Sequence, residues 1–279
     1  MPSTDPTPDD SSTPPDSRSF GTRLAVGWER AMGNLALALV PLLSSLLASD
    51  NVRRVRSAEG YNFGVAFRFP SALPDLWTFV SLPGREPGVH VSSTLWLLPV
   101  LIPVQAALVA GLLGSVRELL RTGQYDFAAN VRRYFLPVVV FVALVRLVGF
   151  GAVTVTAVAP PLGLLFVLGF LLLSYLFYAT PYLVVVADAS VAEALARSYD
   201  WALAGGPYFA YGAGYLVFVV AISLVASAFV VNLGAVGVLV GAVTSAPIAL
   251  ALTFATTEFV ADVDGAETSS PSEIRREGR

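Results

Sequence analysis

The chain has 279 residues, of which 55% are hydrophobic and 13% charged, and its mean hydropathy is +0.70. These values exclude an ordinary water-soluble globular protein, and they predict that lipid surrounds most of the chain. A net charge of −3 excludes a broad basic surface for nucleic acid, and the absence of Cys together with a single His excludes disulfides, thiolate metal sites and sites built on two imidazoles.

Residues 1–19 are expected to form a disordered cytoplasmic tail. The stretch from Met1 to Ser17 holds five Pro and four Asp among Ser and Thr, and it lacks the basic start and the apolar run of a signal peptide. Membrane insertion is therefore expected to depend on the first internal apolar helix.

The next segment, Phe20–Asn34, predicts an amphipathic helix on the cytoplasmic side. Apolar residues recur every four positions, opposite two arginines, as expected of a helix in the lipid headgroup layer. The residues concerned are Phe20, Leu24, Trp28 and Met32 on the apolar side and Arg23 and Arg30 on the other.

Six segments are long and apolar enough to cross a hydrocarbon core about 30 Å thick. They predict an all-α polytopic transmembrane bundle over residues 20–258. Only 231–234 and 159–161 separate the fifth helix from the sixth and the third from the fourth, so these pairs are expected to be antiparallel hairpins. The predicted spans are Ala31–Ala48, Leu95–Val116, Tyr134–Val158, Pro161–Ala187, Phe209–Val231 and Gly234–Thr257.

The loop at 49–94 is expected to lie outside the cell and is apolar where a simple tether would be polar. Aromatic and aliphatic residues alternate with others from Tyr61 to Phe69, which is a strand-like period, and Leu73–Val80 suits a short helix. We expect a cap packed on the outer membrane surface, with Trp77 and Phe79 at headgroup level. The alternative is a lid or ligand-receiving element.

Ser190–Ala204 predicts a second interfacial helix. Ser190 and Glu193 form a capping box, Arg197 follows Glu193 at the favourable i,i+4 spacing, and Gly205-Gly206-Pro207 ends the helix. Residues 118–135 and 193–209 also share a pattern of Glu, Arg, Tyr-Asp and Tyr-Phe, offset by 74 to 76 positions. Three repeated units, at 20–116, 124–187 and 190–258, would explain this pattern; chance similarity between two amphipathic loops is the alternative.

The distribution of arginine predicts the orientation, because cytoplasmic flanks retain positive charge. Eleven arginines fall in the N-terminal segment, the second and fourth loops and the C-terminal tail, and five fall in the loop at 49–94. We therefore expect a multi-pass protein of the cell membrane with both termini cytoplasmic, and we expect 259–279 to be a disordered tail. Arg53, Arg54 and Arg56 lie close to the first span and argue the other way.

Arg146 is the residue that lipid disfavours most, since it lies about 18 Å into the third span. Gln105 lies at nearly the same depth in the second span, where Pro99 and Pro103 also release backbone carbonyls. The two predict a buried polar node, which would be either an anion or substrate site at the centre of the bundle or a satisfied contact between helices. Asp188 and Glu258, at the cytoplasmic ends of two spans, are either solvated carboxylates or members of an ion or proton relay to Arg146.

Small residues recur every four positions on two predicted spans, which allows helices to approach closely. We expect these faces to pack within the bundle; a second copy of the chain, or another membrane partner, bound through the sixth span is the alternative. The residues are Ala107, Gly111 and Ser115 on the second span and Gly237, Gly241 and Ser245 on the sixth.

The sequence contains no HExxH, Gly-x-Ser-x-Gly or Gly-x-Gly-Asp motif and no Lys. It also has no phosphate-binding loop. We therefore expect no catalytic activity, no cofactor and no metal site, and we interpret His90 as a surface residue.

The stretch Pro181-Tyr-Leu-Val-Val-Val-Ala-Asp188, followed by Ser190-Val-Ala-Glu-Ala-Leu-Ala-Arg-Ser198, resembles haloarchaeal membrane proteins of unknown function. The absence of Lys and the excess of acidic residues are similarly typical of extreme halophiles. The layout of 20–258 also resembles the membrane domain attached to some glycerophosphodiester phosphodiesterases, although this chain has no phosphodiesterase domain. The resemblance implies a fold and a cellular location, without catalytic residues.

Together these features predict a non-catalytic membrane module that is structural or binds a partner. The alternative is a small-solute transporter or channel component that uses the node at Arg146. A continuous polar path through the bundle would favour transport, and a dry, tightly packed centre would favour the structural module.

Overall fold

The computed structural model describes residues 18–83, 95–158 and 163–268, and within them every regular element is a helix. Five helices are long and apolar enough to cross a membrane, and a bent pair adds up to one more span. This confirms the prediction of a polytopic helical membrane bundle. The predictions for the terminal tails before 18 and after 268, for His90 and for the turn at 159–161 lie outside the described residues.

Helix α1 (Phe20–Gly33) is the predicted amphipathic helix, and the Ser19 hydroxyl caps it by accepting from the Thr22 amide. The chain then bends by 99° into Leu35–Leu47, which comprises η1 (Leu35–Ala38) and α2 (Leu39–Leu47). The bend shortens the predicted first span, because Ala31–Gly33 belong to α1. At 1.5 Å per residue Leu35–Leu47 is about 20 Å long, less than the hydrocarbon core; α3 (Ser49–Arg56) follows it.

Helices α5 (Leu98–Thr122) and α6 (Phe127–Val158) form a tight hairpin, with η2 (Leu95–Leu97) before α5. Gly123 turns the chain with φ of 75°, a conformation that a side chain would disfavour. Gly111 faces the Phe127 ring so closely that any side chain there would collide with it. Small residues of the second predicted span therefore pack against α6.

The second half of the chain contains α7 (Gly163–Phe177), α8 (Thr180–Val186), α9 (Val191–Ala204), α10 (Gly206–Asn232) and α11 (Gly234–Thr268). Helix α9 lies where it was predicted: the Ser190 hydroxyl accepts from the Glu193 amide at 3.3 Å, and Gly205 ends the helix with φ of 68°. Among the described residues the Glu193 side chain makes no return bond, so the capping box is half formed, and Arg197 pairs with Asp264 of α11. Helix α11 continues well past Thr257, so part of the region expected to be a disordered tail is helical. Its last turns carry acidic residues that pair with arginines of α1 and α9.

The proposed three-fold repeat lacks one of its parts. Helices α1 and α9 are separate amphipathic helices, but Glu118 lies within the end of α5 and Tyr134 lies within α6. Glu193, the expected counterpart of Glu118, instead lies in the first turn of α9. The matching residues therefore occupy different structural positions, which favours chance similarity.

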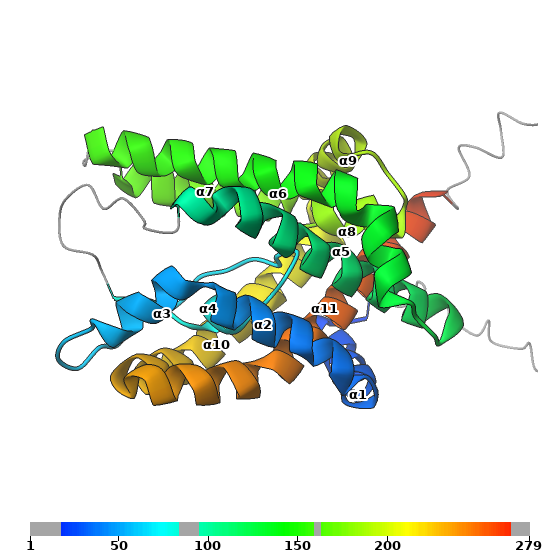
Figure 1. Cartoon of the computed structure of the whole chain (residues 1–279). Coiled ribbons are helices and arrows are strands. Elements are labelled where there is room, and N and C mark those ends of the chain that lie inside the picture. The colour runs from blue at the N-terminus through cyan, green and yellow to red at the C-terminus, as the bar shows by residue number, and fades with distance from the viewer. Residues whose placement is uncertain (1–17, 84–94, 159–162, 269–279) are drawn as a thin grey trace, which may run out of the picture.

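The long helices form two groups, visible in Figure 1. Helices α5, α6 and α7 make one group, and α2, α3, α10 and α11 make the other. They meet at the end that contains α1, α8 and α9, which we call the charged end because its arginines and carboxylates are paired there. The opposite end, where α10 turns into α11 at 232–234, we call the turn end. The chain between α3 and α4 (Leu76–Phe79) runs between the groups.

Buried tyrosines fill the core near the charged end. The rings of Tyr178 and Tyr208 stack with centroids 4.1 Å apart, and the ring of Tyr211 stacks on Phe259 at 4.2 Å. The Tyr178 hydroxyl donates to the Tyr208 carbonyl at 2.7 Å, and Tyr211 shares a hydrogen bond with Thr256 at 2.8 Å. This half of the bundle is densely packed, and these hydroxyls have partners.

Candidate functional site

The most unusual element of the structure is Tyr61–Pro83, which enters the bundle from the turn end and returns to it. We call it the re-entrant segment. At the turn end the Asn62 amide donates to Asn232 Oδ1 at 2.8 Å, and further in the Ala66 amide donates to Ser223 Oγ at 3.0 Å. Phe69 then lies against Gly212, about 30 Å along α10 from Asn232 by helix rise. The segment therefore descends along most of the length of α10.

The segment turns near the charged end and climbs back as α4. At the turn the Tyr182 hydroxyl of α8 donates to the Ser71 carbonyl at 2.7 Å. On the return, the Ser81 amide donates to Ser227 Oγ at 2.8 Å, close to the level where the segment entered. Two serine hydroxyls one turn apart on α10 thus hold the two limbs.

This arrangement corrects two expectations. No strand forms from Tyr61 to Phe69, because the partners of this limb are side chains of helix α10, and the described part of the chain offers no strand to pair with. The segment is also not spread on an outer surface: Trp77 and Phe79 are buried, and Trp77 Nε1 donates to the Ser45 carbonyl of α2 at 2.8 Å. Its level relative to the headgroups stays a prediction.

Asp75 organises the return limb. Its carboxylate accepts from the Trp77 amide at 3.0 Å, from the Thr78 amide and from the Ser44 hydroxyl of α2 at 2.8 Å. The Thr78 hydroxyl reciprocates by accepting from the Asp75 amide, which completes a capping box for α4. The hydrogen bonds made by Asp75 therefore serve to fix the fold of the segment.

Arg68 stands in a different environment. Its side chain is exposed, although it lies beside the buried return limb of the segment. Among the described residues it makes no hydrogen bond and no ion pair, and Asp75 attracts it only over a longer distance. Phe63 and Phe67, on the same limb, are also exposed.

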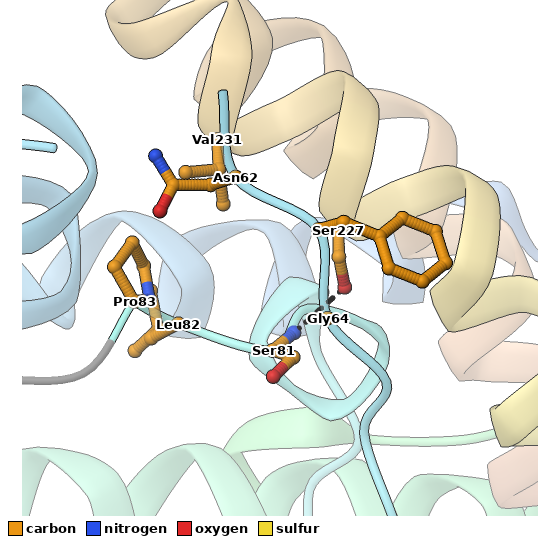
Figure 2. A pocket seen from close by; sticks show the side chains of 8 residues that line it. Asn62, Gly64, Ser81, Leu82, Pro83, Ser227 and Val231 are labelled. Carbon is orange, nitrogen blue, oxygen red and sulfur yellow. Dashed lines mark hydrogen bonds between the residues drawn. The ribbon is translucent and has the colours of Figure 1, made fainter. Parts of the chain in front are cut away.

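A small pocket of about 170 Å³ lies between the two limbs at the turn end (Figure 2). Gly64 and Ser81 face each other across it so closely that a Cβ on Gly64 would lie 2.7 Å from Ser81 Oγ. The hydrogen bond between Ser81 and Ser227 closes one side (Figure 2). The pocket is lined by Asn62, Phe63, Gly64, Ser81, Leu82, Pro83, Ser227 and Val231.

Arg146 and Gln105 meet as the depth argument predicts. Arg146 Nη2 donates to Gln105 Oε1 at 2.5 Å, between α6 and α5. The expectation that the node is buried is wrong, because Arg146 is exposed. The pair therefore has the geometry of a contact between helices, and its role in binding stays a prediction.

Asp188 and Glu258 lie at the charged end, each within a group of arginines. Asp188 accepts from Arg117 at 2.8 Å, from Arg133 at 3.0 Å and from the Tyr134 hydroxyl at 2.9 Å. Partial burial alone would raise the pKa of the Asp188 carboxyl, but the bonds from Arg117 and Tyr134 outweigh it and hold this pKa below its ordinary value. Asp188 adopts φ of 51°, so this junction combines a strained backbone with a fixed charge network.

Glu258 accepts from Arg18 at 2.6 Å and from Arg30. These contacts attach the start of the chain and the interfacial helix α1 to α11. Arg146 lies about 18 Å further along α6 than Tyr134, the partner of Asp188. The structure therefore does not bring Asp188 or Glu258 to Arg146, and the relay stays a prediction without a connecting contact.

The small residues of α11 are used within the chain. A Cβ at Gly237 would lie 2.9 Å from Val230 Cα, and one at Gly241 would lie 2.6 Å from Val230 Cγ2 and 3.0 Å from Leu76 Cδ1; Ser245 is buried. The packing interpretation is confirmed at these positions. The alternative of a second copy bound through this face loses its surface, because α10 and α4 already cover it.

Sequence reasoning missed Arg68, Ser223 and Ser227 as parts of one site. Two serines one turn apart in the middle of an apolar span were the available signal, since each needs a hydrogen-bond partner in lipid. Within the described residues, no group of three or more His, Cys, Asp or Glu side chains could hold a metal ion. Comparisons with protein-family models, with curated proteins and with solved structures find no match to this chain.

Proposed function

We propose that this chain is a non-catalytic membrane protein that binds a polar solute inside the bilayer, as a small-solute transporter or channel component does. The re-entrant segment, Tyr61–Pro83, is its recognition element. The observation that supports this most is the exposed Arg68 on irregular backbone at membrane depth.

Irregular backbone at this depth is tolerated only where protein buries it or where it lines a water-filled space. The return limb meets the first condition, since α4 is buried against α2, α10 and α11. The entering limb carries the exposed Arg68, whose charge is costly in lipid. Water in the space that Arg68 lines is therefore the arrangement with the lowest cost.

We further propose that the charged end is cytoplasmic and that the solute enters from outside, at the turn end. The arginines of α1, α5, α6 and α9 gather at the charged end, where the positive-inside rule places them. The tyrosine core and the ion pairs close this end, so the accessible space opens toward the turn end.

Cysteine accessibility tests the proposal directly, because the chain has no native Cys. Ser71→Cys places a thiol at the exposed tip of the segment. In reconstituted vesicles we expect a membrane-impermeant, charged methanethiosulfonate to label this thiol from the turn-end side. Tyr61→Cys, at the entrance, is the positive control.

The matched control is Val217→Cys, which lies on α10 between Gly212 and Ser223 and is therefore at a similar depth. Val217 is 68% exposed but has lipid as its expected surroundings, and a thiol in lipid does not form the reactive thiolate. We expect no labelling there. Labelling of Tyr61→Cys without labelling of Ser71→Cys would contradict a water-filled space.

That result would favour the second candidate, a structural or partner-binding module. The dense tyrosine core, in which the hydroxyls of Tyr175, Tyr178 and Tyr208 bond to backbone carbonyls, is the observation that supports it. A transport route at Arg146 has less support, since Gln105 already binds its guanidinium.

A further inference from the structure

We infer that Arg68 is the binding residue for an anionic group, a carboxylate or a phosphate, that reaches the middle of the membrane along the entering limb of the re-entrant segment. This inference rests on the proposed function and adds the charge of the ligand. It concerns the anionic group alone, whether that group belongs to a free solute or to a lipid headgroup.

The depth of Arg68 is fixed by its neighbours on the segment. Ala66 binds Ser223, about 14 Å from the turn end of α10 by helix rise, and Phe69 contacts Gly212, about 30 Å from it. Arg68 lies between these two levels, close to the middle of α10. A guanidinium, which keeps its charge under nearly all conditions, is costly at this depth unless water or an anion accompanies it.

No described residue neutralises this charge by contact. Among the described residues Arg68 has no ion-pair partner, whereas Arg23, Arg30, Arg117 and Arg197 all have carboxylate partners. The nearby acid, Asp75, already accepts bonds from Ser44, Trp77 and Thr78. The donors of Arg68 thus remain available, and their fork matches a carboxylate or a phosphate.

The approach to Arg68 also suits an anion. From Tyr61 to Phe67 the entering limb carries no acidic side chain, so nothing on it repels a negative group. The exposed faces of Tyr61, Phe63 and Phe67 accompany the path from the turn end. A cation at the inner end of an uncharged path concentrates anions there, because the field of Arg68 is weakly screened between protein walls.

Charge-selective labelling tests this inference in full-length protein that carries Ser71→Cys. The rate with anionic sulfonatoethyl methanethiosulfonate is divided by the rate with the cationic trimethylammonioethyl reagent. We expect Arg68→Gln to lower this ratio roughly three- to tenfold and Arg68→Lys, which keeps the charge, to preserve it. Arg132→Gln removes an exposed arginine of α6 at the charged end and is expected to leave the ratio unchanged.

The source of the anion is identified by protection of the same thiol. Inorganic phosphate is added outside phosphatidylcholine vesicles, and in a separate arm phosphatidylglycerol is mixed into the vesicles. Slower labelling with phosphate assigns a free anion, and slower labelling with phosphatidylglycerol alone assigns a lipid headgroup. Either effect must disappear in Arg68→Gln, because protection that persists there reflects surface potential and contradicts the inference.

An unchanged ratio in Arg68→Gln, or no protection in either arm, would overturn the anion site while leaving the water-filled space intact. A complete lack of labelling at Ser71→Cys would instead overturn the proposed function. Should Arg68→Gln fail to fold, Arg68→Met serves as the neutral variant in both tests, with the same expected and contradicting results.

Discussion

Removal of the two serine hydroxyls that hold the re-entrant segment should release it from α10. Ser223 is 0% exposed and its bond to the Ala66 amide is buried, so no water can replace this Oγ as the acceptor. Ser227 borders the pocket at the turn end, where water can reach the Ser81 amide. A buried amide left without a partner costs about 1–3 kcal/mol. We therefore expect Ser223→Ala to lower the free energy of unfolding by about 1–3 kcal/mol and Ser227→Ala to lower it by less. The two serines are one turn apart and hold the same segment, so we do not expect their effects to add.

The assay is unfolding by SDS in mixed micelles, followed by tryptophan fluorescence. The chain has four tryptophans, so the measurement uses a background in which Trp28, Trp96 and Trp201 are replaced by Phe. The emission of the buried Trp77 should then move to longer wavelength when the segment detaches. Ser174→Ala is the matched control. The Ser174 hydroxyl donates to a carbonyl of its own helix, so removing this hydroxyl leaves no amide unpaired. If both α10 variants unfold at the same SDS fraction as wild type, the hydroxyls do not hold the segment.

Three further predictions concern other parts of the bundle. Asp188→Asn keeps a residue that tolerates positive φ but removes the charge, and it should lower the free energy of unfolding by about 1 kcal/mol at neutral pH. Because the folded-state pKa of Asp188 is lowered, the stabilisation by its charge is complete above about pH 4 and is lost as the pH falls further. SDS titrations of both proteins at several pH values would show this loss. Gly111→Leu should prevent the close contact of α5 with Phe127, and should remove the folded, monodisperse peak in size-exclusion chromatography, whereas Gly149→Leu, at a position with open space, should not. Thr4→Cys should be labelled only after permeabilisation and Tyr61→Cys without it; the reverse pattern would overturn the orientation.

The spanning helices follow from composition because lipid leaves the chain few choices. An apolar run long enough to cross the bilayer must bond its backbone internally, so α5, α6, α10 and α11 could be predicted from hydropathy alone. Their ends were less predictable. Helix α11 continues because its last turns carry Asp262, which pairs with Arg23 of α1, and a tertiary contact of this kind has no local signal.

The start of the first span was also hard to predict from composition. Its apolar run includes Ala31–Gly33, so composition alone extends the span into α1. The structure ends α1 at Gly33 and bends the chain by 99° because Gly27 lets α1 approach α11 closely. A Cβ at Gly27 would lie 3.2 Å from the Ala255 amide nitrogen, so the direction of α1 is set by packing against a helix more than two hundred positions away.

The re-entrant segment could be recognised as unusual from its sequence, but it could not be placed. Apolar and aromatic side chains suit the membrane surface and the inside of a bundle equally well, and the alternation from Tyr61 to Phe69 suits any extended chain with one buried side. What decides between the two is whether the bundle offers partners for the backbone. Ser223, Ser227 and Asn232 of α10 provide them.

Arg68 and Arg146 both lie deep along the bundle, but only their contacts show whether each guanidinium is already bound within the chain or is available to a ligand. Arg146 is deep by its position on α6, and its position alone made it the stronger candidate. Gln105 on the neighbouring helix accepts a hydrogen bond from Arg146, so this contact offsets part of the free-energy cost of the charge in lipid. Arg68 belongs to a loop, where sequence reasoning assigns no depth, yet it reaches the middle of the bundle without a contacting partner among the described residues. Since an uncompensated guanidinium is costly in lipid, the position that sequence reasoning passed over is the one where a ligand has most to contribute.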